Sequence, residues 1–140
     1  MRLVEAHVRR PRADVREAVV DAARLAKFFV SRASGPLETG ATVTWEWTDV
    51  GASTDVRARE IRDDRITFLW GGEHEPTQVE ISLVADGDVT KVTIDEHPFE
   101  LAEEAAVRAI RQTQGWTEFC CGLRAYLEHG IDLRRGGDVA

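Results

Sequence analysis

Two acidic residues, Glu60 and Glu96, fall in phase with the apolar faces of predicted strands. A carboxylate that faces a closed interior loses hydration and becomes a candidate proton donor or acceptor. One functional hypothesis is therefore general acid–base chemistry at Glu60 or Glu96, assisted by Arg16 or Tyr126. The alternative is that each acid lies at a strand end or pairs with an arginine, because unpaired buried acids are rare.

The sequence gives less support to metal or thiol chemistry. Asp95, Glu96 and His97 are consecutive, and consecutive strand residues point to alternate faces, so they make a poor chelate. Cys120 and Cys121 are adjacent on a predicted helix, where neighbouring side chains point about 100° apart and do not bridge easily. We therefore expect no metal site and a buried Cys120.

Aromatic residues in the middle and near the end of the chain suggest a small-molecule cavity. Such cavities are mostly apolar, with a few polar groups that orient the ligand. Any one of these aromatics could simply fill a core, but as a group they indicate a cavity, and tryptophan and tyrosine add polar handles. The predicted lining residues are Trp45, Trp47, Phe68, Trp70, Glu96, Trp116, Phe119, Cys120, Leu123 and Tyr126.

The N-terminus and the middle of the chain must supply the strands that position these residues. Val4, Ala6 and Val8 alternate with polar residues, and further alternating rows follow between residues 42 and 96. Turn-forming residues separate the rows, for example at 86–88. Short strands joined by tight turns predict an antiparallel meander with one packed face.

Helical spacing appears after the first strand. Asp14 is a candidate cap for a helix over residues 15–20. Leu25, Phe28 and Phe29 continue an apolar face through a second short helix.

A longer helical region follows residue 98. Trp116, Cys120, Leu123 and Leu127 form one apolar stripe, and Gly115 predicts a kink or a close backbone approach to the sheet. Further residues predicted to face the sheet are Ala102, Ala106, Val107 and Ile110, whereas the polar side of the stripe holds Thr117, Glu118, Arg124 and Glu128.

Composition and charge exclude several classes of function. The chain has 140 residues and a 43% hydrophobic content, which suits one domain, predicted over residues 1–132, with a frayed tail at 133–140. The formal net charge of −7 disfavours nucleic acid as a partner, because nucleic-acid binding needs a clustered cationic face. No apolar run has membrane-spanning length and the N-terminus lacks a signal-peptide core, so we expect a cytoplasmic protein.

The order of several segments resembles the activator of heat-shock protein 90 ATPase-like family, within the START-like (SRPBCC, Bet v-like) superfamily. The matching segments are 15–21, 25–29, 66–70, 90–96 and the Gly-Trp opening at Gly115 through Leu127. The resemblance implies an α+β, helix-grip fold, in which a curved antiparallel sheet of six to seven strands wraps round a long C-terminal helix and two short helices lie near the N-terminus. Arg16 departs from the family, which usually has tryptophan there.

The resemblance also implies the leading functional hypothesis, a domain that binds a hydrophobic or amphipathic small molecule between the sheet and the C-terminal helix without a cofactor. One alternative is a chaperone-ATPase-stimulating or stress-related protein-interaction domain. The other is a polyketide cyclase- or hydrolase-like enzyme that uses Glu60 or Glu96. The sequence leaves the ligand open, and it leaves a homodimer open as well.

Overall fold

The computed structural model describes residues 1–71, 76–98 and 103–135. One antiparallel sheet contains seven strands in the order β1-β7-β6-β5-β4-β3-β2. The strands are β1 (Arg2–Val8), β2 (Arg32–Ala33), β3 (Thr42–Trp47), β4 (Ala52–Ile61), β5 (Arg65–Trp70), β6 (Thr77–Asp86) and β7 (Val89–His97). The helices are α1 (Arg12–Val20), α2 (Ala22–Leu25), α3 (Glu103–His129) and a 3₁₀ turn, η1 (Leu133–Arg135).

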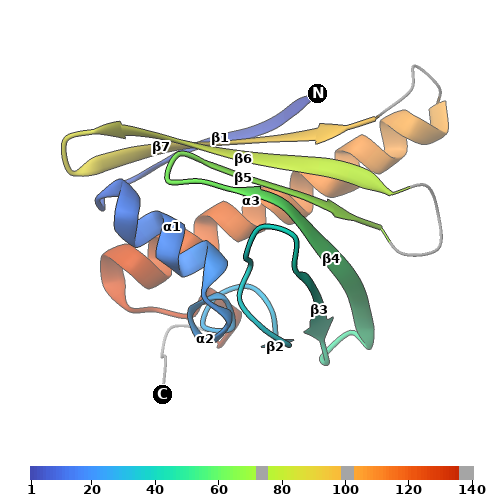
Figure 1. The fold of residues 1–140 in the computed structure, drawn as a ribbon, viewed down its shortest axis with the longest axis horizontal. Helices are drawn as coiled ribbons and strands as arrows, with labels where there is room; N and C mark the ends of the chain where they lie inside the picture. The colour runs from blue at the N-terminus through green and yellow to red at the C-terminus, as the bar shows by residue number, and fades with distance from the viewer. Residues whose placement is uncertain (72–75, 99–102, 136–140) are drawn as a thin grey trace.

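Figure 1 shows α3 running along one face of the curved sheet, with α1 and α2 beside its C-terminal end. This arrangement confirms the predicted helix-grip architecture. None of the helices in the described ranges is long and apolar enough to cross a membrane.

The alternating rows of the sequence form the strands because every second side chain can then reach the core. Ile81 on β6 and Ile94 on β7 are opposite each other in the register, and both are fully buried. The predicted hairpin at 86–88 joins these two strands. Their outward residues stay partly hydrated, as expected for a sheet with one packed face.

The helix α3 differs from its predicted orientation along its first half. Trp116, Cys120 and Leu123 are buried as predicted, but Val107 is 45% exposed and Ile110 is 70% exposed. Ala106 is exposed as well, and Ala102 lies outside the described residues. The inward positions of this half belong instead to Ala109 and Gln112.

Two glycines of α3 have different roles. The helix continues unbroken through Gly115, and an added Cβ there would meet no atom within 4 Å, so the predicted close approach is wrong at this position. Gly122 makes the close approach, because an added Cβ would lie 3.0 Å from the backbone oxygen of Phe28.

The first helix also begins differently from the prediction. Pro11 occupies the N-cap of α1 without a side-chain hydrogen bond, and Asp14 accepts a hydrogen bond from Arg10 at 2.9 Å instead of capping the helix. Asp21 caps α2, where its carboxylate accepts the backbone N–H of Arg24 at 2.9 Å.

The first residues of the predicted tail form the turn η1 at Leu133–Arg135. Arg134 donates to the carbonyl oxygens of Val30 and Ala26, both at 3.0 Å, and to the carboxylate of Asp132 at 2.9 Å. These bonds satisfy the carbonyl group of Ala26 at the C-cap of α2 and that of Val30 in the segment after it, and they connect η1 to this segment. Residues 136–140, the rest of the predicted tail, lie outside the described residues.

Candidate ligand-binding site

A buried carboxylate, Glu96 of β7, joins the sheet to α3. Its side chain accepts hydrogen bonds from Thr77 Oγ1 at 2.6 Å, Trp116 Nε1 at 2.8 Å, Gln112 Nε2 at 3.1 Å and Trp70 Nε1 at 3.4 Å. Glu96 is only 1% exposed. Burying a carboxylate is costly unless donors replace its water, and here four side chains do so.

The donors of Glu96 come from three elements. Trp70 ends β5, Thr77 begins β6, and Gln112 and Trp116 are one turn apart on α3. The sequence predicted that Glu96 and both indoles face the interior, but it did not identify Thr77 or Gln112. The only signal for Gln112 was its spacing of four residues from Trp116, which places both on one helix face.

A cavity of about 590 Å³ opens beside the middle of α3. Side chains of α3 form one wall, and the segment after α2, the end of β3 and η1 form the others. We call it the aromatic cavity; it is lined by Phe28, Phe29, Trp47, Asp49, Val50, Trp70, Gln112, Gly115, Trp116, Glu118, Phe119, Cys121, Gly122, Leu133 and Arg134. Its apolar lining with a few polar groups is typical of small-molecule sites.

A second cavity, of about 380 Å³, lies between the first half of α3 and the sheet. We call it the arginine cavity because Arg108 and Arg111 lie on its helical wall. Its full lining is Trp47, Ala52, Ser53, Thr54, Trp70, Gly71, Thr77, Glu96, Arg108, Arg111 and Gln112.

The predicted lining residues divide between these cavities and the core. Trp47, Trp70, Trp116 and Phe119 line the aromatic cavity, and Glu96 lines the arginine cavity. The others do not line either cavity but pack in or against the core; they are Trp45, Phe68, Cys120, Leu123 and Tyr126. Sequence reasoning missed Phe28, Phe29 and the η1 residues, because their approach to α3 depends on how the chain folds back.

Aromatic rings fill the space between the sheet and the part of α3 that carries Trp116 and Phe119. Trp45 and Phe68 pack edge to face with centroids 5.3 Å apart, and Phe29 lies 4.8 Å from Phe119 and 5.8 Å from Trp116. The aromatic cavity lies beside these rings, next to the end of β3. Trp47 Nε1 donates to the carbonyl of Phe29 at 3.0 Å, which fixes one side of the aromatic cavity.

The second predicted acid, Glu60, lies outside both cavities. A register shift between Ala58 and Glu60 changes the inward parity of β4, so Ile61 packs against the core instead. The Glu60 side chain is 38% exposed and pairs with Arg62. Glu60 therefore fits the alternative explanation, an acid near a strand end that pairs with an arginine.

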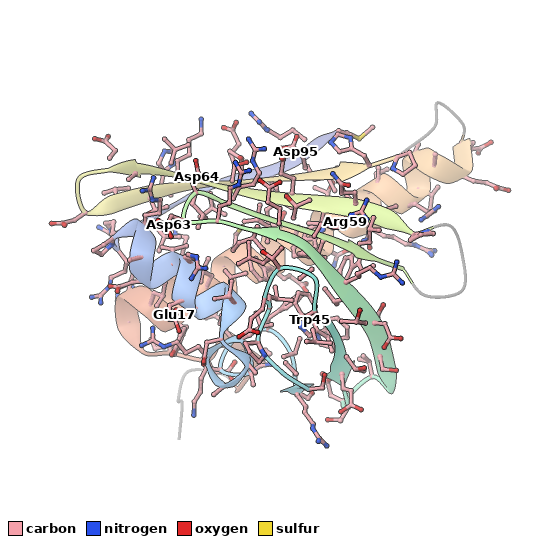
Figure 2. All side chains as sticks on the ribbon, in the orientation of Figure 1. Glu17, Trp45, Arg59, Asp63, Asp64 and Asp95 are labelled. Carbon is pink, nitrogen blue, oxygen red and sulfur yellow. The ribbon has the colours of Figure 1, made fainter. Side chains whose placement is uncertain are left out.

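Arg16 also lies away from the cavities. Its Nε donates to the carbonyl oxygen of Arg62 at 3.1 Å and lies 3.9 Å from Asp63 Oδ1. Figure 2 shows Asp63 and Asp64 at the turn between β4 and β5, near α1. Arg16 therefore joins α1 to this turn and does not assist Glu60 or Glu96.

The two cysteines have different environments. Burial, and to a smaller extent the neighbouring Cys121, raise the pKa of the Cys120 thiol to about 12. Cys121 is exposed and lines the aromatic cavity. Among the described residues, no group of three or more His, Cys, Asp or Glu side chains is placed to hold a metal ion.

Comparisons with known proteins agree with this geometry. The family model described as Activator of Hsp90 ATPase homolog 1-like protein matches residues 9–128. A search of curated proteins finds no match.

Solved structures share the fold over most of the chain. SSP2350 from Staphylococcus saprophyticus is 27% identical, with a TM-score of 0.84 and 96% of each chain covered. DynU16, from the dynemicin biosynthetic locus, is 29% identical with a TM-score of 0.81; the match covers 91% of this chain and 46% of DynU16, so this chain spans about half of that protein. The Aha1 dimer from Colwellia psychrerythraea is 17% identical, with a TM-score of 0.74 over 91% of this chain and 95% of that one, and shows the fold alone.

Proposed function

The chain belongs to the Activator of Hsp90 ATPase homolog 1-like family, and from this premise we propose that it binds a hydrophobic or amphipathic small molecule in the aromatic cavity. The observation that carries the proposal is an open volume of about 590 Å³ beside α3, within the range of ligand pockets. Rings of Trp47, Trp70 and Phe119 would cover the apolar part of the ligand.

The polar groups of the cavity would orient the ligand. Gln112 reaches the cavity from α3, and Arg134 reaches it from η1. Both are held in place, since Gln112 donates to Glu96 and Arg134 donates to backbone carbonyls. Groups fixed in this way lose little further freedom when a ligand binds, which favours affinity.

Gly115 gives a direct test, because it lines the cavity and has empty space at its Cβ position. In a thermal-shift screen of apolar and amphipathic compounds, those that bind should raise the melting temperature of the protein. A ligand at 100 times its Kd adds roughly 2.7 kcal/mol to the free energy of unfolding. We expect Gly115→Leu to abolish these shifts by filling the cavity.

The matched control is Gln114→Leu, which places the same side chain on an exposed neighbour that lines neither cavity. This variant should retain every shift. The proposal is wrong if no compound raises the melting temperature, or if Gly115→Leu responds as the unchanged chain does.

The family name supports a second proposal, binding to a chaperone ATPase. The structural observation that favours it is the exposure of Val107 and Ile110, which are three residues apart on the outer face of α3. A Val107→Ser, Ile110→Ser variant should then lose stimulation of a purified Hsp90-type ATPase while it keeps the ligand-induced thermal shifts. Absence of stimulation by the unchanged chain would contradict this second proposal.

Neither acid supports the enzyme hypothesis as a proposal. Glu60 lies outside both cavities, and the oxygens of Glu96 are occupied by four donors. Glu96 is better explained as the group that positions Trp70, Trp116 and Gln112.

A further inference from the structure

We propose that the arginine cavity binds the anionic group of a ligand whose apolar part lies in the aromatic cavity. This inference rests on the proposed function and adds a chemical class to it: an amphiphile with one carboxylate or phosphate at the end of an apolar body.

The two cavities are neighbours. Trp47, Trp70 and Gln112 line both of them, so a single layer of side chains separates the two volumes. Trp47 and Trp70 are only partly buried, and each lines both cavities. A ligand that passes over these rings can therefore contact both cavities at once.

The charge of the arginine cavity is suited to an anion. Arg108 and Arg111 lie on its α3 wall, and neither forms an ion pair within the part of the chain that the structure describes. Guanidinium groups bind carboxylate and phosphate through paired N–H donors. Thr54, which is opposite the buried Trp45 in the β3–β4 register, adds a hydroxyl group to the wall formed by β4.

The whole molecule carries a formal net charge of −7, so an anion is repelled in general. An anionic ligand must therefore be held by a local cationic group, and Arg108 with Arg111 provides one on the cavity wall.

Glu96 at the base of the arginine cavity does not reverse this charge preference. Its oxygens already accept hydrogen bonds from Thr77, Gln112 and both indoles, so the carboxylate is compensated from within the protein. An anion would lie towards the guanidinium groups and away from Glu96. The same donors leave Glu96 poorly placed to bind a cation.

Four probes with the same tail test the inference by isothermal titration calorimetry: dodecanoate, dodecyl phosphate, 1-dodecanol and dodecyltrimethylammonium. The three ionic probes are kept below their micelle concentrations, and 1-dodecanol is kept below its solubility limit. We expect at least one anionic probe to bind about tenfold or more tightly than 1-dodecanol. The two anionic probes distinguish a carboxylate from a phosphate ligand.

An Arg108→Gln, Arg111→Gln variant should lose this preference while its affinity for 1-dodecanol stays unchanged. The matched control, Arg57→Gln with Arg59→Gln, removes the same charge from exposed residues of β4 that line neither cavity, and it should keep the preference. On the unchanged chain, raising the NaCl concentration should weaken the anionic probes and not 1-dodecanol.

The outcomes separate this inference from the proposed function. If none of the four probes binds, both are overturned. If 1-dodecanol or the cationic probe binds as tightly as the anions, or if the preference survives in the Arg108→Gln, Arg111→Gln variant, then the apolar cavity remains and the anion site is wrong.

Discussion

Glu96 has an acceptor role that a neutral side chain of the same size cannot fill. Four donors point at its two oxygens, and they come from β5, β6 and α3. A glutamine would keep one oxygen acceptor, but its amide nitrogen carries two N–H donors. These would face the donor groups that now bind the second carboxylate oxygen. The effect of this change is therefore decided by unsatisfied hydrogen bonds and not by volume.

We expect Glu96→Gln to lower the free energy of unfolding by about 1.5–3 kcal/mol, the range for a hydrogen bond to a charged group. Urea unfolding at pH 7 measures the change. Glu80→Gln is the control, because Glu80 pairs with Arg65 on the half-exposed side of the sheet and should cost about 0.5 kcal/mol or less. If both variants lost the same free energy of unfolding, the hydrogen bonds to Glu96 would not be a special contribution to stability.

The adjacent thiols should react very differently. Because burial raises the pKa of Cys120 to about 12, almost none of it is thiolate at pH 8, whereas Cys121 is exposed. We expect Ellman's reagent to modify one thiol per folded chain at pH 8 and the second only after denaturation. Reaction of both thiols at similar rates in the folded protein would show that Cys120 is accessible. In a Cys121→Ser variant, the fast reaction with Ellman's reagent should be lost, while the thiol that reacts only after denaturation should remain.

Hydrophobic spacing predicted most of the elements, since the strand rows and the stripe of Trp116, Cys120 and Leu123 are buried as expected. Hydrophobic spacing gave the wrong orientation for the first half of α3, where a polar contact faces the sheet. In the first half of α3, Gln112 faces inward as a donor to Glu96, and Ile110 is left exposed. Spacing rules assign apolar residues to the core, so they could not reveal a helix rotated by a contact between distant residues.

Several predicted lining residues do border a cavity, and these are residues whose position depends on one strand or helix face. Trp47 and Trp70 line the cavities because they end inward rows of their strands. Glu60 was misplaced because a bulge in β4 reverses the alternation, and one extra residue leaves little trace in the sequence. Arg134 was assigned to a frayed tail because its acceptors lie more than a hundred positions away in the chain.

The two glycines of α3 offer a matched comparison within one helix. Gly115→Ala should raise the free energy of unfolding by about 0.5–1 kcal/mol, because alanine is the better helix former and its Cβ meets open space. Gly122→Ala should lower it, since the added Cβ would lie 3.0 Å from the Phe28 backbone oxygen. Thermal or urea unfolding measures both. If both substitutions stabilised the protein, the backbone at Phe28 would be able to move away from the added Cβ at little cost.

Across the whole molecule, the end of α3 is tied to the end of β1. Glu128 accepts the backbone N–H of Arg9 at 3.0 Å and its Nε at 3.2 Å, although the sequence placed Glu128 on the polar side of the helix. Its side chain is only 6% exposed. The backbone N–H of Arg9, followed by the Arg9 guanidinium, holds the pKa of Glu128 below its ordinary value of 4.5.

This contact should make stability depend on pH. Because the folded-state pKa is lowered, the charged Glu128 stabilises the protein above its unfolded pKa, and the contribution is lost as the pH falls through the folded pKa. We expect Glu128→Gln to be about 1 kcal/mol less stable than the unchanged chain at pH 7. The difference should shrink below about pH 4. Urea unfolding across this range measures it.

The control is Glu38→Gln, an exposed residue outside every ion pair of the described chain, which should not alter the pH profile. A constant difference between the Glu128→Gln variant and the unchanged chain from pH 7 to pH 3 would show that the charge of Glu128 is not the stabilising feature.

Three of the four tryptophans, Trp47, Trp70 and Trp116, line the aromatic cavity, and the fourth, Trp45, is buried beside them. The protein therefore contains its own optical reporter. A guest that displaces water from these rings should shift their ultraviolet emission to shorter wavelength, while Trp45 supplies a nearly constant background. Occupancy could then be followed in an unlabelled sample.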